Sequence, residues 1–212
     1  MRRMDDVLLE LLQLLMMGII VLLLMTVCFW LWIKKLRSKK YDLTKISLAD
    51  IDKMSGHDFE DYLVVLFAAL GFKDIYLTKK SRDFGADMIF YNQHLEKTVL
   101  QAKRYSDKLG LTAVQEVYAA QAFYEAKRGL IVTTSSRISD PCYQLALATQ
   151  IGIIDRDGVE HIIKLLKKGK VEQARLFMEE AFVVEPYQYE NSLEQLDTER
   201  HILKVGDYYY KR

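Results

Sequence analysis

ADMIFYNQHLEKTVLQAK (residues 86–103) has the pattern of a β-hairpin. Its two apolar runs, Ala86–Tyr91 and Thr98–Lys103, contain the Ile, Phe, Tyr, Thr and Val residues that favour strands. The polar segment Asn92–Lys97 between them has a length suited to a hairpin connection. We therefore expect two adjacent antiparallel strands here.

Polar side chains interrupt this hairpin at one end. Side chains alternate along a strand, so Gln101 and Lys103 share one face of the second strand and Ala102 takes the other. The pairing of the two strands brings Asp87 close to Gln101 and Lys103. A carboxylate, an amide oxygen and an ammonium group then converge at one sheet edge, an arrangement that apolar packing alone does not favour. Oxygen ligands of this kind suit Mg²⁺, and a lysine beside such an ion can orient water or offset phosphate charge.

Helical and strand patterns alternate on both sides of the hairpin. Helices are predicted over Met54–Leu70, Leu111–Ala126, Pro141–Gln150 and Gly158–Lys168, and further strands over Ile75–Thr78, Leu130–Thr134 and Ile151–Asp155. This order predicts an α/β fold, with a mixed sheet flanked by helices.

Composition excludes several other classes of protein. Half of the 212 residues are hydrophobic and two are proline, which rules out a disordered chain. Two cysteines, Cys28 and Cys142, cannot build a disulfide framework, and no Cys/His cluster indicates zinc. Residues 1–40 hold seven basic and three acidic side chains, while residues 41–212 have a net charge of −3. A strongly basic wrapper of nucleic acid is therefore excluded, and any polyanion must be bound locally.

The N-terminal region contains an uncharged run, Leu11–Ile33, that predicts a transmembrane helix. At about 1.5 Å per residue it spans the hydrocarbon core of roughly 30 Å. A buried core helix rarely has this length without polar residues. A cleaved signal peptide has a shorter apolar stretch that ends in small residues, whereas this run ends in aromatic residues. The lipid bilayer is thus the predicted partner of residues 11–33.

Flanking charges predict the orientation of this helix. Five basic side chains follow it: Lys34, Lys35, Arg37, Lys39 and Lys40. The positive-inside rule places that side in the cytoplasm, so we expect a single-pass protein of the cell membrane with a cytoplasmic domain. The predicted organisation is a membrane anchor with its basic flank (1–40), a linker and helix start (41–55), a catalytic-type domain (56–170) and a C-terminal extension (171–212).

Five motifs follow one another between residues 56 and 163: His57-Asp58-Phe59-Glu60, Leu70-Gly71-Phe72, Ser81-Arg82-Asp83-Phe84-Gly85-Ala86-Asp87, Gln101-Ala102-Lys103-Arg104-Tyr105 and Gly129-Leu130-Ile131-Val132-Thr133-Thr134. In this order and spacing they resemble the catalytic domain of Mrr-type restriction endonucleases, in the PD-(D/E)xK nuclease superfamily. The resemblance covers about half of the chain and implies a restriction-endonuclease-like fold.

The same resemblance implies the roles of individual residues. Asp87 corresponds to the metal-binding aspartate, Gln101 stands where most of the superfamily has Glu or Asp, and Lys103 corresponds to the catalytic lysine. Gln is usual in the Mrr-like branch, but it removes one negative charge from the Mg²⁺ site. Glu60 matches the acidic residue that often completes such sites as a metal ligand. It could equally be a solvated helix residue, and both readings stay open.

Basic clusters beside the predicted site could supply local contacts to DNA. The candidate residues are Lys79, Lys80, Arg82, Arg104 and Arg137. Such short charge runs can also be solvated faces. The segment Thr133–Arg137 follows a buried strand, where its hydroxyls and arginine suit either phosphate contacts or a helix-capping role.

Together these features predict a membrane-anchored, cytoplasm-facing, Mg²⁺-dependent endonuclease of the restriction type that hydrolyses phosphodiester bonds of double-stranded DNA. The alternative is a catalytically inactive DNA-binding or membrane-adaptor protein on the same fold, in which Asp87 and Lys103 form a structural ion pair. Intact Asp87, Gln101 and Lys103 favour the enzyme, whereas the acidic balance of residues 41–212 favours the adaptor. A monomer and a homodimer are both compatible with the sequence.

Overall fold

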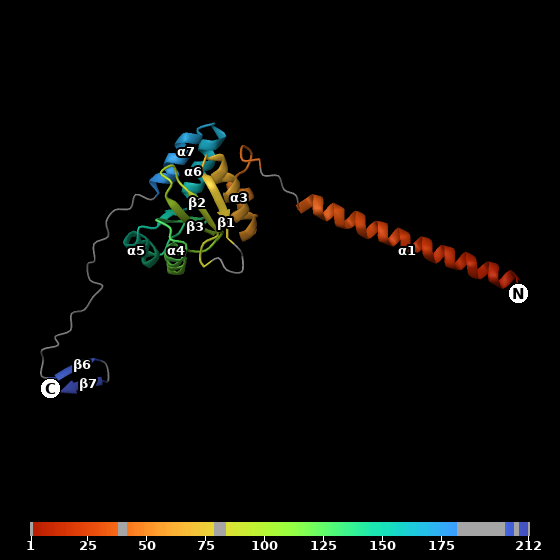
Figure 1. The fold of residues 1–212 in the computed structure, drawn as a ribbon, viewed down its shortest axis with the longest axis horizontal. Helices are drawn as coiled ribbons and strands as arrows, with labels where there is room; N and C mark the ends of the chain where they lie inside the picture. The colour runs from red at the N-terminus through yellow and green to blue at the C-terminus, as the bar shows by residue number, and fades with distance from the viewer. Residues whose placement is uncertain (1, 38–41, 79–83, 182–201, 206–207, 212) are drawn as a thin grey trace. The chain divides into compact units, whose positions relative to one another are not determined.

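The computed structural model describes residues 2–37, 42–78, 84–181, 202–205 and 208–211. It divides the chain into two compact units, Met1–Lys45 and Ile46–Arg212, which are described separately here. The secondary-structure elements are labelled in Figure 1.

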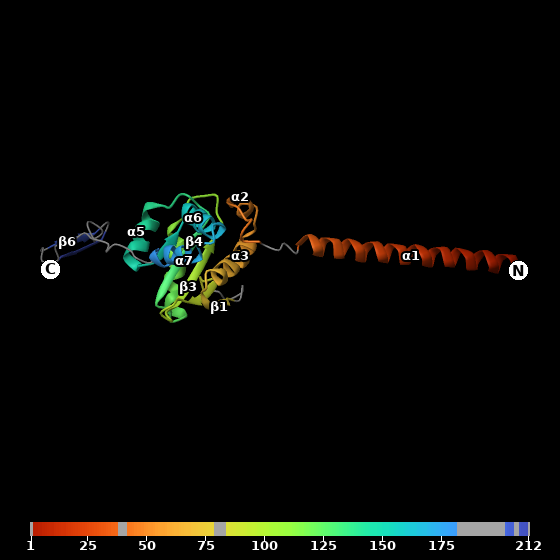
Figure 2. The ribbon, with the colours of Figure 1, turned by 90° about the horizontal axis from the view of Figure 1, so that it is seen from above.

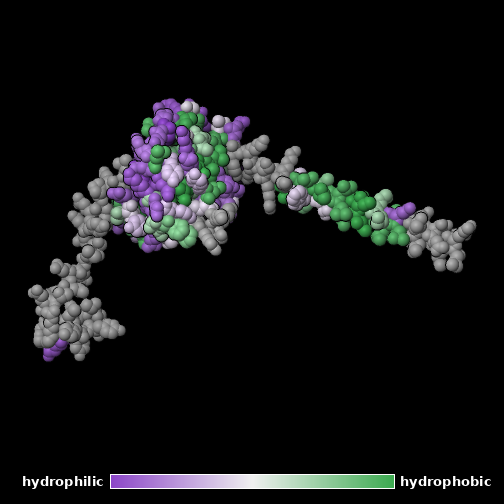
Figure 3. Space-filling view, viewed as in Figure 1, coloured by the Kyte–Doolittle hydropathy of each residue, from purple (hydrophilic) through white to green (hydrophobic). Residues whose placement is uncertain are grey.

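Helix α1 (Arg2–Arg37) makes up most of the first unit. Its segment Leu12–Ile33 has a mean hydropathy of 2.7 and is long and apolar enough to cross a membrane. Residues 12–32 are exposed, and most of the surface of this helix is hydrophobic (green in Figure 3). By length and composition the segment fits a membrane span, although an N-terminal signal sequence meets the same criteria. The predicted apolar helix is therefore present, with the length and composition of a membrane span.

The second unit alternates helices and strands as the sequence predicts. Its elements are α2 (Leu48–Ile51), α3 (Gly56–Ala69), β1 (Lys73–Leu77), β2 (Met88–Tyr91), β3 (Lys97–Lys103), α4 (Leu111–Phe123), β4 (Arg128–Thr133), α5 (Asp140–Thr149), β5 (Gly152–Ile154), α6 (Arg156–Lys167), α7 (Val171–Glu180), β6 (Ile202–Val205) and β7 (Tyr208–Lys211). The short helix α2 and the two-stranded sheet of β6 and β7 were not predicted. A four-residue helix is too short to produce a helical period.

Five strands form a mixed sheet in the order β1-β2-β3-β4-β5, which confirms the predicted fold class. The pairs β1–β2 and β2–β3 are antiparallel, and β3–β4 and β4–β5 are parallel. Antiparallel pairing in β2–β3 follows from the short hairpin connection. Parallel pairing in the second half requires crossovers, which α4 and α5 supply (Figure 1).

Helices cover the sheet in two groups. Helices α4 and α5 pack against one face, where Val99 and Ile131 join a buried cluster with Val114, Val117 and other apolar residues. On the other face α3 packs against β1 and β3, and α6 packs against β4, β5 and α7 (Figure 2). Both faces of the central strands are buried, so these strands are apolar along most of their length.

Aromatic residues anchor α3 to the sheet. The ring centroids of Phe67 on α3 and Phe90 on β2 lie 4.8 Å apart, and Phe72 lies 5.1 Å from Phe90. Gly71 ends the helix region with φ +86°, a left-handed conformation that glycine adopts without a steric cost. This anchoring fixes α3 beside the end of β3, where the predicted site lies.

Candidate active site

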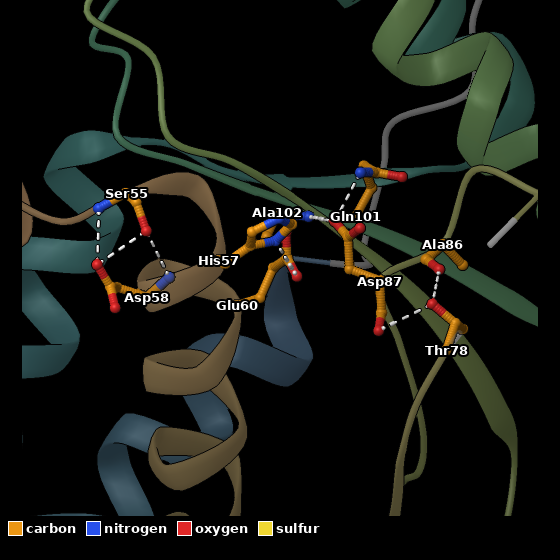
Figure 4. Close-up of polar contacts among 9 residues, drawn as sticks. All are labelled: Ser55, His57, Asp58, Glu60, Thr78, Ala86, Asp87, Gln101 and Ala102. Carbon is orange, nitrogen blue, oxygen red and sulfur yellow. Dashed lines mark hydrogen bonds and ion pairs between the residues drawn. The ribbon is translucent and has the colours of Figure 1, made fainter. Parts of the chain in front are cut away.

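Asp87 lies immediately before β2, directly across from Gln101 near the end of β3. Its backbone N–H donates to the carbonyl of Leu100 (2.8 Å), which continues the β2–β3 pairing. Its carboxylate oxygen Oδ2 accepts hydrogen bonds from Gln101 Nε2 (2.6 Å) and from the backbone N–H of Ala102 (2.7 Å) (Figure 4). The hairpin therefore brings Asp87 and Gln101 into direct contact, as the register of the two runs predicts.

A second strand holds the loop before Asp87. The hydroxyl of Thr78, just after β1, donates to the carbonyl of Ala86 (2.6 Å), and the N–H of Thr78 donates to the carbonyl of Asp87 (3.0 Å). Figure 4 shows the bonds from the Thr78 hydroxyl to the carbonyls of Ala86 and Asp87 (3.2 Å for the second), on the side of Asp87 away from Gln101. The backbone of Asp87 is thus fixed by β1 and β3 together, so its side chain is held by a rigid part of the sheet.

Gln101 carries a buried acceptor. The residue is only 7% exposed, and its amide oxygen Oε1 has no hydrogen-bond partner among the residues that the structure describes. A buried polar atom without a partner costs free energy. Thr98, Gln121 and Glu179 also carry such an atom, but the Gln101 side chain is in contact with Asp87. Gln101 Nε2 is hydrogen-bonded to the Asp87 carboxylate. The Gln101 amide oxygen and the Asp87 carboxylate therefore lie close together, at the same end of the β2–β3 pair. This donor set fits a hard divalent cation such as Mg²⁺, which prefers oxygen ligands and keeps several waters.

Glu60, the further predicted metal ligand, comes from the first turns of α3. Its carboxylate oxygens lie 3.2 and 3.3 Å from Nδ1 of His57, one turn earlier on the same helix. Within the described ranges, no three His, Cys, Asp or Glu side chains are grouped so that they could hold a metal ion. Glu60 is therefore paired with a histidine in this structure, and its role as a metal ligand stays a prediction.

Lys103 ends β3, and its side chain is 16% exposed. Its Nζ lies 2.7 Å from the carboxylate of Glu116 on α4 and 5.9 Å from the ring centroid of Tyr105. Burial alone lowers the pKa of the Lys103 ammonium, but the hydrogen bond and charge of Glu116, with Tyr105 and Asp87, outweigh it and hold this pKa above its usual value. Lys103 is thus charged, and its ion-pair partner is Glu116 instead of the Asp87 considered above.

Glu116 is the site residue that sequence reasoning missed. The buried residues of α4 are Ala113, Val114, Val117 and Ala120, which define its apolar stripe. Glu116 borders this stripe, since it lies three residues after Ala113 on the helix. A charged residue at the edge of a buried helical stripe lies close to the sheet, so it indicates an oppositely charged partner there.

The predicted DNA-contact residues differ in their surroundings. Arg104 Nη1 donates to the backbone carbonyl of Asp52 (3.2 Å). Arg137 is exposed. The remaining three, Lys79, Lys80 and Arg82, lie outside the described residues. Arg104 directly follows Lys103 in the sequence, so its backbone lies next to the proposed site.

The hydroxyl-rich segment after β4 has a structural role. Thr133 and Thr134 donate to the backbone carbonyls of Lys103 (2.8 Å) and Tyr105 (2.9 Å), and Ser135 donates to that of Asp107 (2.6 Å). These three residues are buried. The hydroxyls thus hold the segment after Lys103 against β4, which disfavours the phosphate-contact reading for them.

A mixed five-stranded sheet, with an aspartate and a Gln-x-Lys sequence on neighbouring strand ends, defines the restriction-endonuclease-like class of fold. The family model of the restriction endonuclease catalytic domain, Mrr_cat, matches residues 51–163, which is more than half of the chain. The chain therefore belongs to the Mrr-type restriction endonuclease family of the PD-(D/E)xK superfamily, as the sequence motifs predicted.

Two solved structures have a similar fold. One is the ATP-dependent Type ISP restriction-modification enzyme LlaBIII bound to DNA, with 17% identity, a TM-score of 0.43 and coverage of 55% of this chain and 8% of that chain. The other is the DNA modification-dependent restriction endonuclease AspBHI, with 20% identity, a TM-score of 0.40 and coverage of 68% and 40%. The chain thus spans less than half the length of either protein. No curated protein matches it.

Proposed function

We propose that this protein is a membrane-anchored, Mg²⁺-dependent endonuclease that hydrolyses phosphodiester bonds of double-stranded DNA. The observation that carries the proposal is the contact between Asp87 and Gln101. Gln101 Oε1 is buried at the same strand end and has no hydrogen-bond partner in the described part of the chain. Membership of a restriction endonuclease family supports the reaction class. DNA as the substrate is supported by the same family membership.

In this proposal each site residue has a separate task. Asp87 and Gln101 would hold Mg²⁺, with Glu60 as a further ligand. The contact of Glu60 with His57 is compatible with this role, because a carboxylate has several lone pairs and metal-binding carboxylates commonly accept a hydrogen bond as well. A bound Mg²⁺ ion polarises a phosphoryl oxygen and lowers the pKa of a bound water. Lys103, charged and half-buried, orients the attacking water and offsets negative charge that develops on the phosphate.

Contacts to the DNA backbone are assigned to basic residues around this site. Arg104 and Arg137 belong to the segments that follow β3 and β4, and Lys79, Lys80 and Arg82 precede Asp87 in the sequence. The net charge of −3 in residues 41–212 means that affinity has to come from these local contacts. Their phosphate contacts would position the duplex without reading its sequence.

A plasmid-nicking assay with the purified full-length chain in detergent tests the proposed activity. We expect conversion of supercoiled plasmid to nicked or linear forms with Mg²⁺, and no conversion with EDTA. Binding of plasmid without any metal-dependent cleavage would refute the nuclease function and favour the DNA-binding adaptor instead.

The hydrogen bond between Gln101 and Asp87 makes Gln101→Glu a test of whether Gln101 is a metal ligand. Without metal, this substitution places a second carboxylate against Asp87 Oδ2, where the amide now donates at 2.6 Å. We expect a loss of about 1–2 kcal/mol of stability from this like-charge contact, seen as a melting temperature lower by roughly 2–8 °C in EDTA. Mg²⁺ should restore this loss and raise the melting temperature more than in the wild type, and cleavage should persist.

Gln101→Ala is the matched control, because it removes the oxygen ligand without adding charge. We expect weaker Mg²⁺ stabilisation and slower cleavage. The ligand role of Gln101 is wrong if Gln101→Glu abolishes cleavage while Gln101→Ala retains it.

Membrane anchoring through residues 11–33 is the second part of the proposal. It is supported by the uncharged helical segment Leu12–Ile33 and by the five basic residues that follow. A reporter that is active only in the cytoplasm, fused after Arg212, should be active in intact cells. Deletion of residues 1–33 should move the protein from the membrane fraction to the soluble fraction.

A reporter that works only on the opposite side of the membrane provides the control for orientation. Activity from that reporter alone would reverse the predicted topology. Release of a shortened mature protein, detected by mass spectrometry of the N-terminus, would identify residues 11–33 as a cleaved signal sequence.

A further inference from the structure

The loop that leads to Asp87 lies directly on the backbone of Glu116. Gly85 has φ +88°, and a Cβ atom placed there would lie 2.5 Å from the carbonyl oxygen of Glu116 and 2.8 Å from its carbonyl carbon. Real Cβ atoms essentially never approach backbone this closely, so only glycine fits at this position. Helix α4 is therefore in close contact with the chain two residues before the proposed metal-binding aspartate.

The side chain of the same residue reaches the other half of the site. The Glu116 carboxylate accepts from Lys103 Nζ at 2.7 Å, and Lys103 is two residues after Gln101. A lysine side chain has four rotatable bonds, and restricting them costs about 1.5–2 kcal/mol of conformational entropy. The Glu116 carboxylate, on helix α4 beside the site, supplies an interaction that favours one conformer of the Lys103 side chain.

We propose that Glu116 is a positioning residue, which holds the Lys103 ammonium at the strand end beside Asp87 and Gln101. This inference rests on the proposed nuclease function, in which Lys103 acts on the attacking water or on phosphate charge. Glu116 acts through Lys103 and not as a metal ligand, because its carboxylate is paired with the Lys103 ammonium at 2.7 Å.

Exposure distinguishes this pair from an ordinary surface ion pair of the same chain. On α6, Lys164 and Glu160 lie 2.8 Å apart, and their side chains are 60% and 42% exposed. Glu116 is similarly exposed at 38%, but Lys103 is only 16% exposed. Water competes strongly for the ammonium of Lys164 and much less for that of Lys103. The pair on α6 is therefore a matched control for substitutions of Glu116.

The kinetic test uses the full-length protein in detergent, with Glu116→Ala, Glu116→Gln and the control variant Glu160→Ala. Single-turnover cleavage with Mg²⁺ should be about tenfold to a hundredfold slower for Glu116→Ala, as expected for a misplaced catalytic group. Glu116→Gln keeps an acceptor oxygen of the same reach and should recover a large part of that rate. DNA affinity in EDTA and the melting temperature should change little, and Glu160→Ala should match the wild type.

A double-variant cycle separates positioning of Lys103 from any independent role of Glu116. In the Lys103→Ala background, Glu116→Ala should cause no further loss of rate, because the group it positions is already absent. Fully additive losses would overturn the proposal, as would a wild-type rate in Glu116→Ala. If Glu116→Ala fails to fold, the nearly isosteric Glu116→Gln carries the same cycle.

A second readout does not depend on cleavage. Acylation of lysine amines, followed by mass spectrometry, should modify Lys103 several-fold faster in Glu116→Ala than in the wild type, and at an intermediate rate in Glu116→Gln. Lys103 should react at the wild-type rate in Glu160→Ala. Unchanged labelling of Lys103 in Glu116→Ala would show that the carboxylate does not hold the amine. If the wild type does not cleave DNA, the nuclease function and the catalytic purpose of the pair both fail, and labelling then decides only whether the pair exists.

Discussion

Lys103→Ala is expected to lower the rate of metal-dependent DNA cleavage by about a hundredfold or more, which is the scale of losing one preorganised electrostatic group. The ammonium of Lys103 is held in a half-buried position by Glu116 and keeps its charge there. Its effect is greatest on charge that develops in the transition state, so the rate should fall much more than the affinity for DNA. Single-turnover cleavage at saturating protein measures the cleavage rate without a contribution from DNA affinity.

Binding of DNA to the same variant, measured in EDTA over a range of salt concentrations, provides the comparison. One lost phosphate contact should change the slope of log affinity against log salt by about one unit or less. The stability of the variant should be close to that of the wild type, since Glu116 is 38% exposed and can be solvated once its partner is gone. Lys108→Ala is a suitable control, because Lys108 is exposed on the segment that follows β3. Undiminished cleavage by Lys103→Ala would show that another group has this role.

Asp87→Asn is expected to have the larger effect, a loss of about a thousandfold or more in cleavage rate. Asparagine has the shape of aspartate and keeps an oxygen that can accept from the N–H of Ala102, so the fold should persist. It removes the negative charge from the Asp87–Gln101 pair, and with it the main attraction for Mg²⁺. Loss of a bound metal withdraws several kcal/mol of transition-state stabilisation, and each 1.36 kcal/mol corresponds to about a tenfold change in rate.

Two measurements check this expectation. Cleavage at increasing Mg²⁺ concentrations should not recover to the wild-type rate in Asp87→Asn, and calorimetric titration with Mg²⁺ should show weakened binding. Asp107→Asn is the matched control, because Asp107 is an exposed aspartate on the segment after β3 and has no predicted role. Wild-type cleavage by Asp87→Asn would remove Asp87 from the metal site and with it the central part of the proposed function.

Much of the fold could be predicted because its elements are local and regular. The hairpin of β2 and β3 was predicted from two apolar runs and a short polar connection, and its register follows from that connection. The buried strand β4 and the crossover helices α4 and α5 were recognisable from period and composition. The contact of Asp87 with Gln101 was predictable for the same reason, since both lie on neighbouring strands of one hairpin.

Contacts between distant segments were not predictable in this way. The guanidinium of Arg156, at the start of α6, makes two bonds of 2.7 Å to the carboxylate of Asp52, which ends α2. These residues are 104 positions apart, and neither has a sequence context that points to the other. Such a pair forms because packing brings α2 next to the carboxyl end of β4, where Arg156 also donates to the carbonyl of Thr134 (3.3 Å).

The class of the domain, its family and the presence of an apolar N-terminal helix could be inferred from the sequence alone, because they depend on periodicity, spacing and composition. The partners of charged side chains on different elements, such as Lys103 with Glu116 and Arg156 with Asp52, followed from the tertiary fold instead. A charged side chain gains stabilisation from whichever opposite charge lies within a few ångströms, and that distance is set by how helices dock on the sheet. Helix docking in turn depends on the shape of the whole core, as the contact of Gly85 with α4 illustrates.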